Sequence, residues 1–537
     1  MEGFAPPPVA AIEATELLIA SIVVAVAGLN LLARRISVPY PIVLVIAGLG
    51  LGLIPEAPTI RLQPELVLLV FLPPLLYAAA AFADVRALRA ELGAISALAI
   101  GLVVVTTLVV AVVGHEVLGL SWALAFALGA IVSPTDPVAA AAIMQRLGVD
   151  RSIVTVVEGE SLINDATALV LYKTAIAAAV GAGFSVVDAG LEFVVDGLGG
   201  IAVGLVVGLV VNFARRRIED PATMITISLV SGYAAYLPAD ELGASGVLAA
   251  VTAGLVVATR LSEYSSPEQR LQGFAVWEMV VFILNATLFV LIGSQLPVIV
   301  DAAVGESAIE ELGYAALVCA VVIAVRFIWV LSVPAVRTLV RSDGRAGREG
   351  ELASRVVIAW SGLRGAVSLA AALAIPVSTE AGEQLEGRSL VLFITFAVIL
   401  VTILGQGLTL PPLIRRLGVR ADPEAERSEE ARARLEATTA AIEVLDELEG
   451  EEWAREETLE RLRSVLAARR RRFASRAGEL EEEGIEQRAA DYRRVMEELY
   501  RVQRQTVIRL RDAGQISNEI MRRIERDLDL EQAREEL

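Results

Sequence analysis

Residues 133–173 read SPTDPVAAAAIMQRLGVDRSIVTVVEGESLINDATALVLYK, and this stretch decides the fold. Two apolar helical segments meet in it, and each carries acidic side chains near its middle. With their flanking residues, both segments are long enough to cross about 30 Å of hydrocarbon. An ionisable group at that depth costs about 3 kcal/mol or more, so Asp136, Glu160 and Asp165 indicate a functional site inside a membrane.

The first segment is predicted to be interrupted at its centre. Pro134 and Pro137 flank Thr135 and Asp136 about halfway through the run. Each proline removes a helix hydrogen bond and clashes with the preceding turn, so we expect the backbone to unwind here. Unwound backbone at membrane depth is tolerated only inside protein or along a cavity, where its carbonyl groups can bind a cation.

The second segment carries polar side chains on two faces. Ser161 and Asp165 are four residues apart and share one helical face. Glu160 and Asn164 form a second stripe, rotated by about 100°. Alkali cations are hard and prefer oxygen ligands. The Asp165 carboxylate, the Ser161 hydroxyl and a carbonyl near Thr135 therefore predict a Na⁺ site built from oxygen alone.

Glu160 faces away from this site and needs a partner to stay ionised inside the membrane. Two arginines are mid-span candidates, Arg326 in VVIAVRFIWVL and Arg364 in WSGLRGAVSL. We favour an ion pair between Glu160 and Arg326, because Arg364 lies beside Gly362 and Gly365 in what is predicted to be a second interrupted helix. For Arg364, a supporting role in that helix and a direct role in function both stay open.

Apolar runs of this kind fill the chain as far as about residue 415. The 537 residues are 55% hydrophobic and 5% aromatic, with a mean hydropathy of +0.63. Such a chain is expected to bury its apolar surface in lipid. A scan for runs that can span a bilayer predicts about thirteen helices, with approximate centres near Val24, Ala47, Val70, Val103, Ala130, Ala166, Val203, Leu229, Ala250, Ile283, Val322, Val367 and Val398.

The loops between these spans alternate in charge. Every second loop is rich in arginine, including residues 34–35, 215–217 and 337–355. The loops between them are poor in arginine, and the stretch 301–311 is acidic. Under the positive-inside rule, this pattern places the N-terminus outside and the C-terminus in the cytoplasm. The alternation requires an odd number of spans, in agreement with thirteen.

Composition changes at residue 421. Residues 1–420 are predicted to form the transmembrane domain. Residues 421–537 are rich in Glu, Arg, Ala and Leu with apolar residues at helical spacing, which predicts a cytosolic charged helical tail. We favour a solvated helical bundle or a dimerising coiled coil for the tail over an ion or pH sensor. Helix breaks are expected at three glycines, Gly450, Gly484 and Gly514.

Charge and cysteine usage argue against several classes of function. A net charge of −18 and a pI near 4.8 argue against nucleic acid, and against an anionic lipid surface, as a partner of the whole protein. One histidine and one cysteine exclude an intramolecular disulfide and a His/Cys metal centre. Without a catalytic His or Cys pair or a GxxxxGK phosphate loop, we predict no enzymatic activity and no cofactor. The expected partners are monovalent cations, protons and the lipid bilayer.

Residues 133–173 resemble the most characteristic stretch of the cation:proton antiporter 1 family, the bacterial and eukaryotic sodium/proton exchangers. Three further stretches are similar to that family: FLPPLLY at Phe71–Tyr77, WEMVVFILNATLFVLIG from Trp277 and WSGLRGAVSLAAALAIP from Trp360. The resemblance implies an all-α polytopic membrane protein that forms a homodimer. It further implies about thirteen transmembrane helices in two inverted repeats with crossed broken helices, and a core subdomain that moves against a dimerisation subdomain.

The same resemblance implies roles for single residues. Asp165 corresponds to the essential carboxylate that binds cation or proton, and Asn164 precedes it as in the electroneutral members. The remaining roles are ion ligation by Ser161 and the Thr135 backbone, support of the broken helices by Asp136, and a buried ion pair of Glu160 with Arg326.

One position departs from the family pattern. Many relatives carry an acidic residue shortly after the FLPP stretch, whereas this chain has four alanines there, from Ala78 to Ala81. An additional carboxylate ligand or gate is therefore absent, which leaves cation affinity and selectivity open.

These features predict a secondary active antiporter of the cell membrane that exchanges Na⁺ or Li⁺ for H⁺. We expect electroneutral one-for-one exchange by alternating access of an elevator type, serving pH and sodium homeostasis. A buried carboxylate can be neutralised by a proton or by a cation, so competition for Asp165 would couple the two fluxes. Potassium/proton exchange is the alternative, since oxygen ligands alone do not fix cation size. A cation channel or a sensor is less favoured, because no filter loop is present.

Overall fold

The structure is a computed structural model, and it forms two compact units, Met1–Arg420 and Ala421–Leu537. Regular structure in the described part of the chain is helical, apart from one isolated β-bridge between Ser378 and Gln384. The described residues are 28–54 without 30, 34, 36 and 37, then 67–181, 186–295, 297, 299, 308–333, 348–379, 384–449, 451, 453–480 and 485–536.

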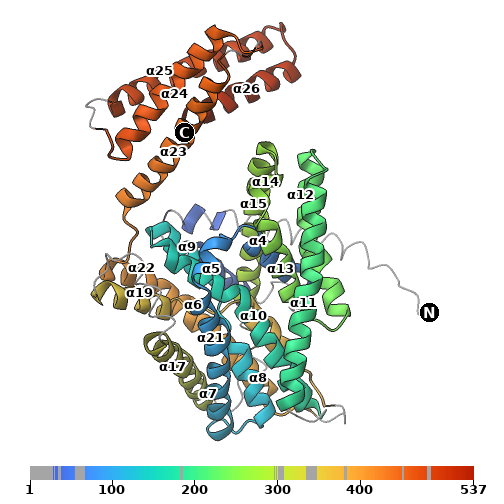
Figure 1. The fold of residues 1–537 in the computed structure, drawn as a ribbon. Helices are drawn as coiled ribbons and strands as arrows, with labels where there is room; N and C mark the ends of the chain where they lie inside the picture. Colours follow the sequence, from blue (N-terminus) through green and yellow to red (C-terminus); the bar gives the residue numbers. More distant parts are fainter. Residues whose placement is uncertain are drawn as a thin grey trace, which may run out of the picture. The chain divides into compact units, whose positions relative to one another are not determined.

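The first unit is a bundle of helices in which α8, α10 and α21 pack together (Figure 1). Three π-helical stretches interrupt or precede these helices: Ala97–Leu102 joins α6 to α7, Val401–Gln406 joins α21 to α22, and Val67–Phe71 leads into α4. The α-helices are α2 (Tyr40–Gly52), α4 (Leu72–Ala81), α5 (Val85–Ala90), α6 (Leu92–Ser96), α7 (Val103–Glu116), α8 (Trp122–Val132), α9 (Pro137–Leu147), α10 (Arg151–Val180), α11 (Val186–Arg215), α12 (Pro221–Glu241), α13 (Gly246–Ala258), α14 (Leu261–Tyr264), α15 (Pro267–Ser294), α17 (Ala308–Ser332), α19 (Arg348–Trp360), α20 (Ala366–Leu373), α21 (Arg388–Leu400) and α22 (Gly407–Leu417).

Eight helical segments of the described residues are long and apolar enough to cross a membrane, and three shorter apolar helices accompany them. Twelve of the thirteen expected span centres lie in helices, while Val24 lies outside the described residues. The count of thirteen therefore stays a prediction. Large apolar side chains on α11 are exposed, including Leu209, Val210 and Phe213, as expected of a helix face that meets lipid rather than water.

The two predicted interruptions are both present. Residues 133–136 separate α8 from α9, and residues 361–365 separate α19 from α20. Pro137 is the first residue of α9, where its missing N–H costs nothing, and the Asp136 side chain caps that helix by accepting the Val138 N–H at 2.9 Å.

The two interruptions touch each other at their centres. The Asp136 N–H donates to the Leu363 carbonyl at 2.8 Å. A side chain at Gly365 would collide with the Asp136 carboxylate, so the second break approaches Asp136 as closely as glycine allows. The broken helices are therefore crossed, and α10 runs uninterrupted beside α8 and α9.

The second unit contains α23 (Pro423–Glu447), α24 (Glu456–Arg476), α25 (Ile485–Asp512) and α26 (Asn518–Glu536). Arg463 of α24 pairs with Asp446 of α23 at 2.7 Å, and α25 packs against α26. Gly514 has a φ of +71° and ends α25 as expected, whereas Gly450 and Gly484 lie outside the described residues. The cytosolic location of this unit stays a prediction.

The close packing of α2 against α15 can be used to test the fold. Gly48 of α2 lies against the backbone of Val290 and Gly293 on α15, with no space for a Cβ atom. Gly48→Leu is expected to force the two helices apart, and overpacking typically costs about 1–3 kcal/mol. We expect a lower melting temperature of the purified protein in detergent.

Gly50 offers the matched control on the same helix, because a Cβ atom there meets no neighbour. Gly50→Leu should leave the melting temperature near that of the wild type. Equal melting temperatures for both variants would contradict the α2–α15 packing.

Candidate ion-binding site

A cavity of about 800 Å³ opens between α4 and α15 on one side and α9, α10 and α20 on the other. Most of its lining is apolar. Pro134, Thr135 and Asp136 of the first helix interruption line it, together with Pro137 at the start of α9 and Gly365 of the second interruption. The crossing of the broken helices thus forms part of the cavity wall.

The two polar stripes of α10 point in different directions. Ser161 and Asp165 line the cavity, whereas Glu160 and Asn164 do not. A four-residue spacing keeps each pair on one face, and the rotation between the pairs separates a cavity face from a face packed against other helices.

All charged side chains on the described lining of the cavity are acidic. Five carboxylates contribute, and no lysine, arginine or histidine does; the five are Asp84, Asp136, Glu158, Asp165 and Glu278. Carboxylates of one sign inside low-dielectric walls focus a negative potential, which raises the local concentration of cations and repels anions. The cavity is therefore suited to a positively charged guest.

Asp165 differs from Asp136 in what surrounds its carboxylate. Asp136 is engaged as the cap of α9. Asp165 is only 7% exposed, and no hydrogen bond to its side chain is found among the described residues. Ser161, equally buried, lies one turn away on the same face. A buried carboxylate that the protein leaves without a donor needs a proton or a cation to offset the cost of its burial.

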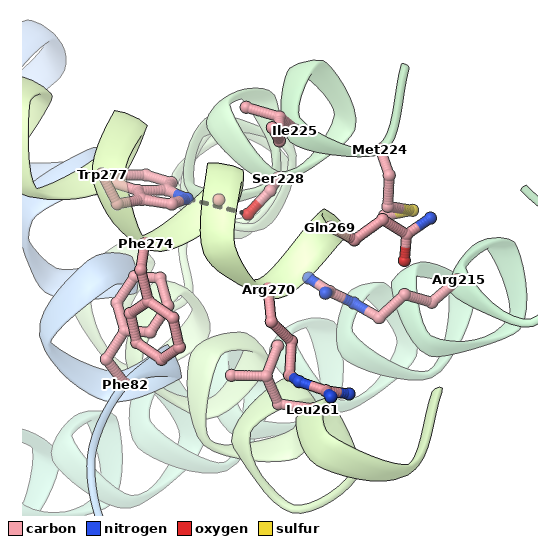
Figure 2. Close-up of a pocket in the computed structure, with 11 residues that line it drawn as sticks. Phe82, Arg215, Met224, Ile225, Ser228, Leu261, Gln269, Arg270, Phe274 and Trp277 are labelled. Carbon is pink, nitrogen blue, oxygen red and sulfur yellow. Dashed lines mark hydrogen bonds between the residues drawn. The ribbon is translucent and has the colours of Figure 1, made fainter. Parts of the chain in front are cut away.

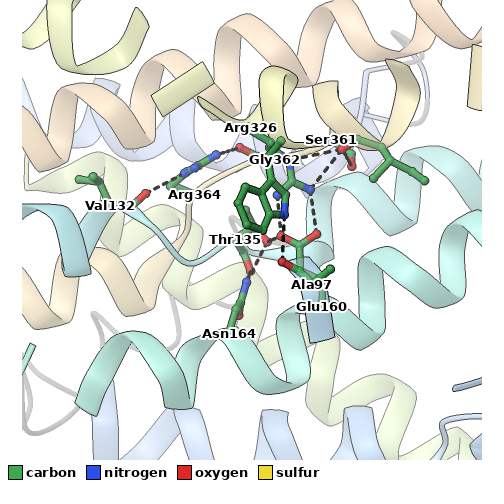
Figure 3. A network of polar contacts seen from close by, with 11 residues as sticks. Ala97, Val132, Thr135, Glu160, Asn164, Arg326, Ser361, Gly362 and Arg364 are labelled. Atoms are coloured by element: carbon green, nitrogen blue, oxygen red, sulfur yellow. Dashed lines mark hydrogen bonds and ion pairs between the residues drawn. The ribbon is translucent and has the colours of Figure 1, made fainter. Parts of the chain in front are cut away.

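Thr135 links the first helix interruption to the other face of α10 (Figure 3). Its hydroxyl donates to Glu160 Oε1 at 2.9 Å and accepts from Asn164 Nδ2 at 2.9 Å. The same amide also approaches the Thr135 carbonyl at 3.4 Å. Asn164 thus holds the unwound segment in place from outside the cavity, and the Thr135 carbonyl keeps a lone pair for another partner.

Glu160 and Arg326 form a bidentate ion pair, with Nη1–Oε1 at 2.5 Å and Nη2–Oε2 at 2.8 Å. Both side chains are almost fully buried. Arg326 also donates to the Ile358 carbonyl, which lies in the last turn of α19. The pair therefore joins α10, α17 and α19 through one cluster of charge-assisted hydrogen bonds.

Arg364 satisfies backbone carbonyls at the crossing. Its Nε donates to the Val132 carbonyl at 3.0 Å, and its Nη1 donates to Gly362 (Figure 3). Val132 is the last residue of α8, so the guanidinium lies where the helix dipole is negative. The backbone N–H of Arg364 donates to the Thr402 hydroxyl at 3.1 Å. Sequence reasoning missed Thr402, which is one of two threonines in the apolar run 390–404.

Comparison with known proteins identifies the family. Residues 19–416 match the family described as sodium/hydrogen exchanger, transmembrane. The chain belongs to this family. This exchanger is accordingly a multi-pass membrane protein and a secondary transporter rather than an enzyme.

Relatives and one solved structure agree with that identification. The exchanger is 36% identical over 519 residues to an uncharacterized Na⁺/H⁺ exchanger of Mycobacterium tuberculosis, covering 96% of this chain and 95% of that one. It is 34% identical to the Na⁺/H⁺ antiporter ApNhaP of Aphanothece halophytica, covering 73% and 72% of the two chains. The sodium proton antiporter MjNhaP1 from Methanocaldococcus jannaschii has the same fold, with a TM-score of 0.60 and 18% identity over 76% of this chain and 99% of that one.

The Glu160–Arg326 pair predicts a specific pattern of stability changes. Glu160→Gln leaves the Arg326 charge buried without a counter-ion, and breaking a buried pair typically costs about 3–5 kcal/mol. Arg326→Met should destabilise the protein similarly. The double variant should melt at a higher temperature than either single variant, because it buries no unpaired charge.

The wild type, the two single variants and the double variant form a double-mutant cycle, which is measured by melting temperatures in detergent. Arg146→Met, at an exposed site on α9, is the control. Additive losses in the double variant would show that the two charges do not stabilise each other.

Proposed function

We propose that this exchanger transports Na⁺ or Li⁺ in exchange for H⁺, with Asp165 as the group that binds either ion. The observation that carries the proposal is a buried carboxylate to which no described residue donates a hydrogen bond, at a cavity whose described charged lining is acidic, beside two crossed helix interruptions. Ser161 and the Thr135 carbonyl are the proposed additional ligands of the cation.

Coupling follows from competition for one carboxylate. An ionised carboxylate resists transfer across hydrocarbon, whereas the same group neutralised by a proton or by Na⁺ crosses at lower cost. If the site changes sides only when Asp165 is neutralised, each cycle carries one cation one way and one proton the other. Asn164 favours electroneutral exchange, because it adds no second ionisable group next to Asp165.

The moving part is proposed to contain α8, α9, α10, α19 and α20. Hydrogen bonds tie these helices together at Thr135, Asn164 and Asp136. The helices α2, α4, α11, α12, α13 and α15 pack on one another as a second group, and the cavity lies between the groups. This division supports an elevator type of alternating access.

The proposal also covers the oligomeric state, the membrane orientation and the physiological role. We propose a homodimer in the cell membrane with an external N-terminus, a cytoplasmic tail at 421–537, and a role in pH and sodium homeostasis. The alternation of arginine between loops supports the orientation.

Potassium/proton exchange is the second candidate. A relative from Bacillus subtilis, 34% identical over 400 residues that cover 72% of this chain and 59% of that one, is a sodium, potassium, lithium and rubidium/H⁺ antiporter. In this exchanger Ala78 and Ala79 line the cavity where many relatives have an acidic side chain. A site with fewer ligands sets a weaker limit on cation size.

Asp165→Asn is the direct test of the mechanism. The amide is isosteric but can neither release a proton nor neutralise Na⁺, so we expect no exchange from a protein that folds and inserts normally. Proton movement into proteoliposomes driven by a Na⁺ gradient measures the activity. Glu278→Gln removes a carboxylate from the same cavity, away from the crossing, and should retain exchange.

Sodium-driven proton movement in Asp165→Asn at the wild-type rate would eliminate Asp165 as the coupling group. Proton uptake that needs no opposing cation gradient would indicate a channel instead.

Stoichiometry is tested by an imposed membrane potential. Electroneutral exchange moves no net charge, so the rate of Na⁺-driven proton transport should not change when the potential is clamped at zero or at an inside-negative value. Repeating the assay with Li⁺ and K⁺ ranks the substrates. A rate that rises or falls steeply with potential would contradict one-for-one exchange.

A further inference from the structure

A second, smaller pocket lies apart from the ion-binding residues, where the end of α11 meets the beginnings of α12 and α15 (Figure 2). Its volume is about 30 Å³. A single water needs roughly 10–15 Å³ on this measure, so the pocket has space for a few oxygen-sized groups. Two arginines line it, Arg215 at the end of α11 and Arg270 in the first turn of α15.

Arg215 is buried, and the described residues supply no counter-ion for it. It is 9% exposed, Nη1 donates to the Ser265 hydroxyl at 2.8 Å, and Nε has no hydrogen-bond partner among the described residues. The Tyr77 hydroxyl is a neighbour of the Arg215 guanidinium. No carboxylate pairs with Arg215 among the described residues. A buried guanidinium in this condition is costly, and an anion would reduce the cost.

Arg270 adds a second unneutralised charge. It donates to the backbone carbonyls of Ser265 at 2.6 Å and Ser262 at 3.3 Å, which orient the guanidinium but do not balance its charge. No ion pair of Arg270 occurs within the described ranges. Two arginines around one small space are a common arrangement for binding the oxygens of a phosphate.

Two further arginines, Arg216 and Arg217, follow Arg215 in the chain. Arg216 lies 4.1 Å from the ring centre of Tyr264, and Arg217 lies 5.2 Å from that of Phe213. Neither forms an ion pair with a described residue. Four carboxylates occur in the neighbouring segments. Glu263 is paired with Arg260 at 2.6 Å, Asp220 caps α12 through the Thr223 N–H, and neither Glu219 nor Glu268 lines the pocket. The charged side chains that do line it are both arginines, so the lining favours an anion.

Several apolar side chains beside the pocket are exposed, as is expected of side chains that face lipid. Phe213 on α11 and Leu271 and Phe274 on α15 are at least half exposed. An anionic headgroup in the pocket could therefore continue into acyl chains that lie along these helices. Under the proposed orientation this end of the bundle faces the cytoplasm.

We propose that the pocket formed by Arg215, Arg270, Ser228 and Gln269 binds a negatively charged phosphate group, as carried by an anionic lipid headgroup or by inorganic phosphate. This site is separate from Asp165. Three aromatic residues, Phe82, Phe274 and Trp277, line both this pocket and the ion cavity, and Trp277 Nε1 donates to the Ser228 hydroxyl at 3.0 Å. A bound phosphate would thus lie behind one wall of the transport cavity.

The test uses two variants of the full-length, delipidated protein in detergent. Arg270→Gln removes one charge. Gly273→Leu keeps both arginines but fills the pocket, because Gly273 lines it and a Cβ atom there meets no neighbour. The control is Arg89→Gln, an equal charge change at an exposed site on α5.

The melting temperature and the amount of bound lipid are measured after adding phosphatidylglycerol, phosphatidylcholine or inorganic phosphate. Phosphatidylglycerol should stabilise the wild type and Arg89→Gln. Losing one charge-assisted contact should weaken its binding about tenfold in Arg270→Gln, and Gly273→Leu should lose it. Inorganic phosphate that stabilises the wild type as strongly, and fails on both variants, would assign the site to the free ion.

Two outcomes would overturn the proposal. One is equal stabilisation of the wild type, Arg270→Gln and Gly273→Leu by phosphatidylglycerol. The other is equal stabilisation of the wild type by phosphatidylglycerol and phosphatidylcholine, together with no effect of inorganic phosphate. Sodium/proton exchange is measured separately, so failure of the phosphate site leaves the role of Asp165 untouched.

Discussion

Two interrupted helices can exist inside a membrane only if the backbone groups that they expose find partners within the protein. Here each interruption supplies partners to the other. The Asp136 N–H binds the Leu363 carbonyl, and the Arg364 guanidinium binds the Val132 carbonyl at the end of α8. The remaining features of the site depend on this mutual pairing, because it gives the unwound backbone the hydrogen-bond partners that hydrocarbon cannot supply.

The uninterrupted helix α10 separates two uses of acidic side chains that are five residues apart. Glu160 is neutralised permanently by Arg326 and stabilises the crossing. Asp165 receives no comparable partner from the described residues. The difference arises from helix geometry, since a five-residue separation turns the second carboxylate away from the ion pair and toward the cavity. The buried ion pair and the carboxylate proposed to bind ions therefore lie on different faces of one helix.

Features set by local chemistry could be predicted from the sequence. Pro134 and Pro137 indicated the first interruption, and helical periodicity separated Ser161 and Asp165 from Glu160 and Asn164. The choice of Arg326 over Arg364 for Glu160 agrees with the observed pair. Contacts between distant segments could not be predicted, because no local sequence pattern encodes them. Arg364 binding to Val132, the Thr402 support and the pocket around Arg215 depend on how separate helices meet.

The small side chains of Ala78 and Ala79 line the cavity that contains Asp165, whose volume is about 800 Å³. Under the proposed mechanism, a cavity of this size lets a cation keep part of its hydration shell until it reaches the carboxylate, instead of exchanging all its water for protein oxygens. Discrimination among alkali ions depends largely on the cost of stripping that water. A site that demands little stripping separates Li⁺, Na⁺ and K⁺ weakly, so ion abundance would decide which of them occupies it.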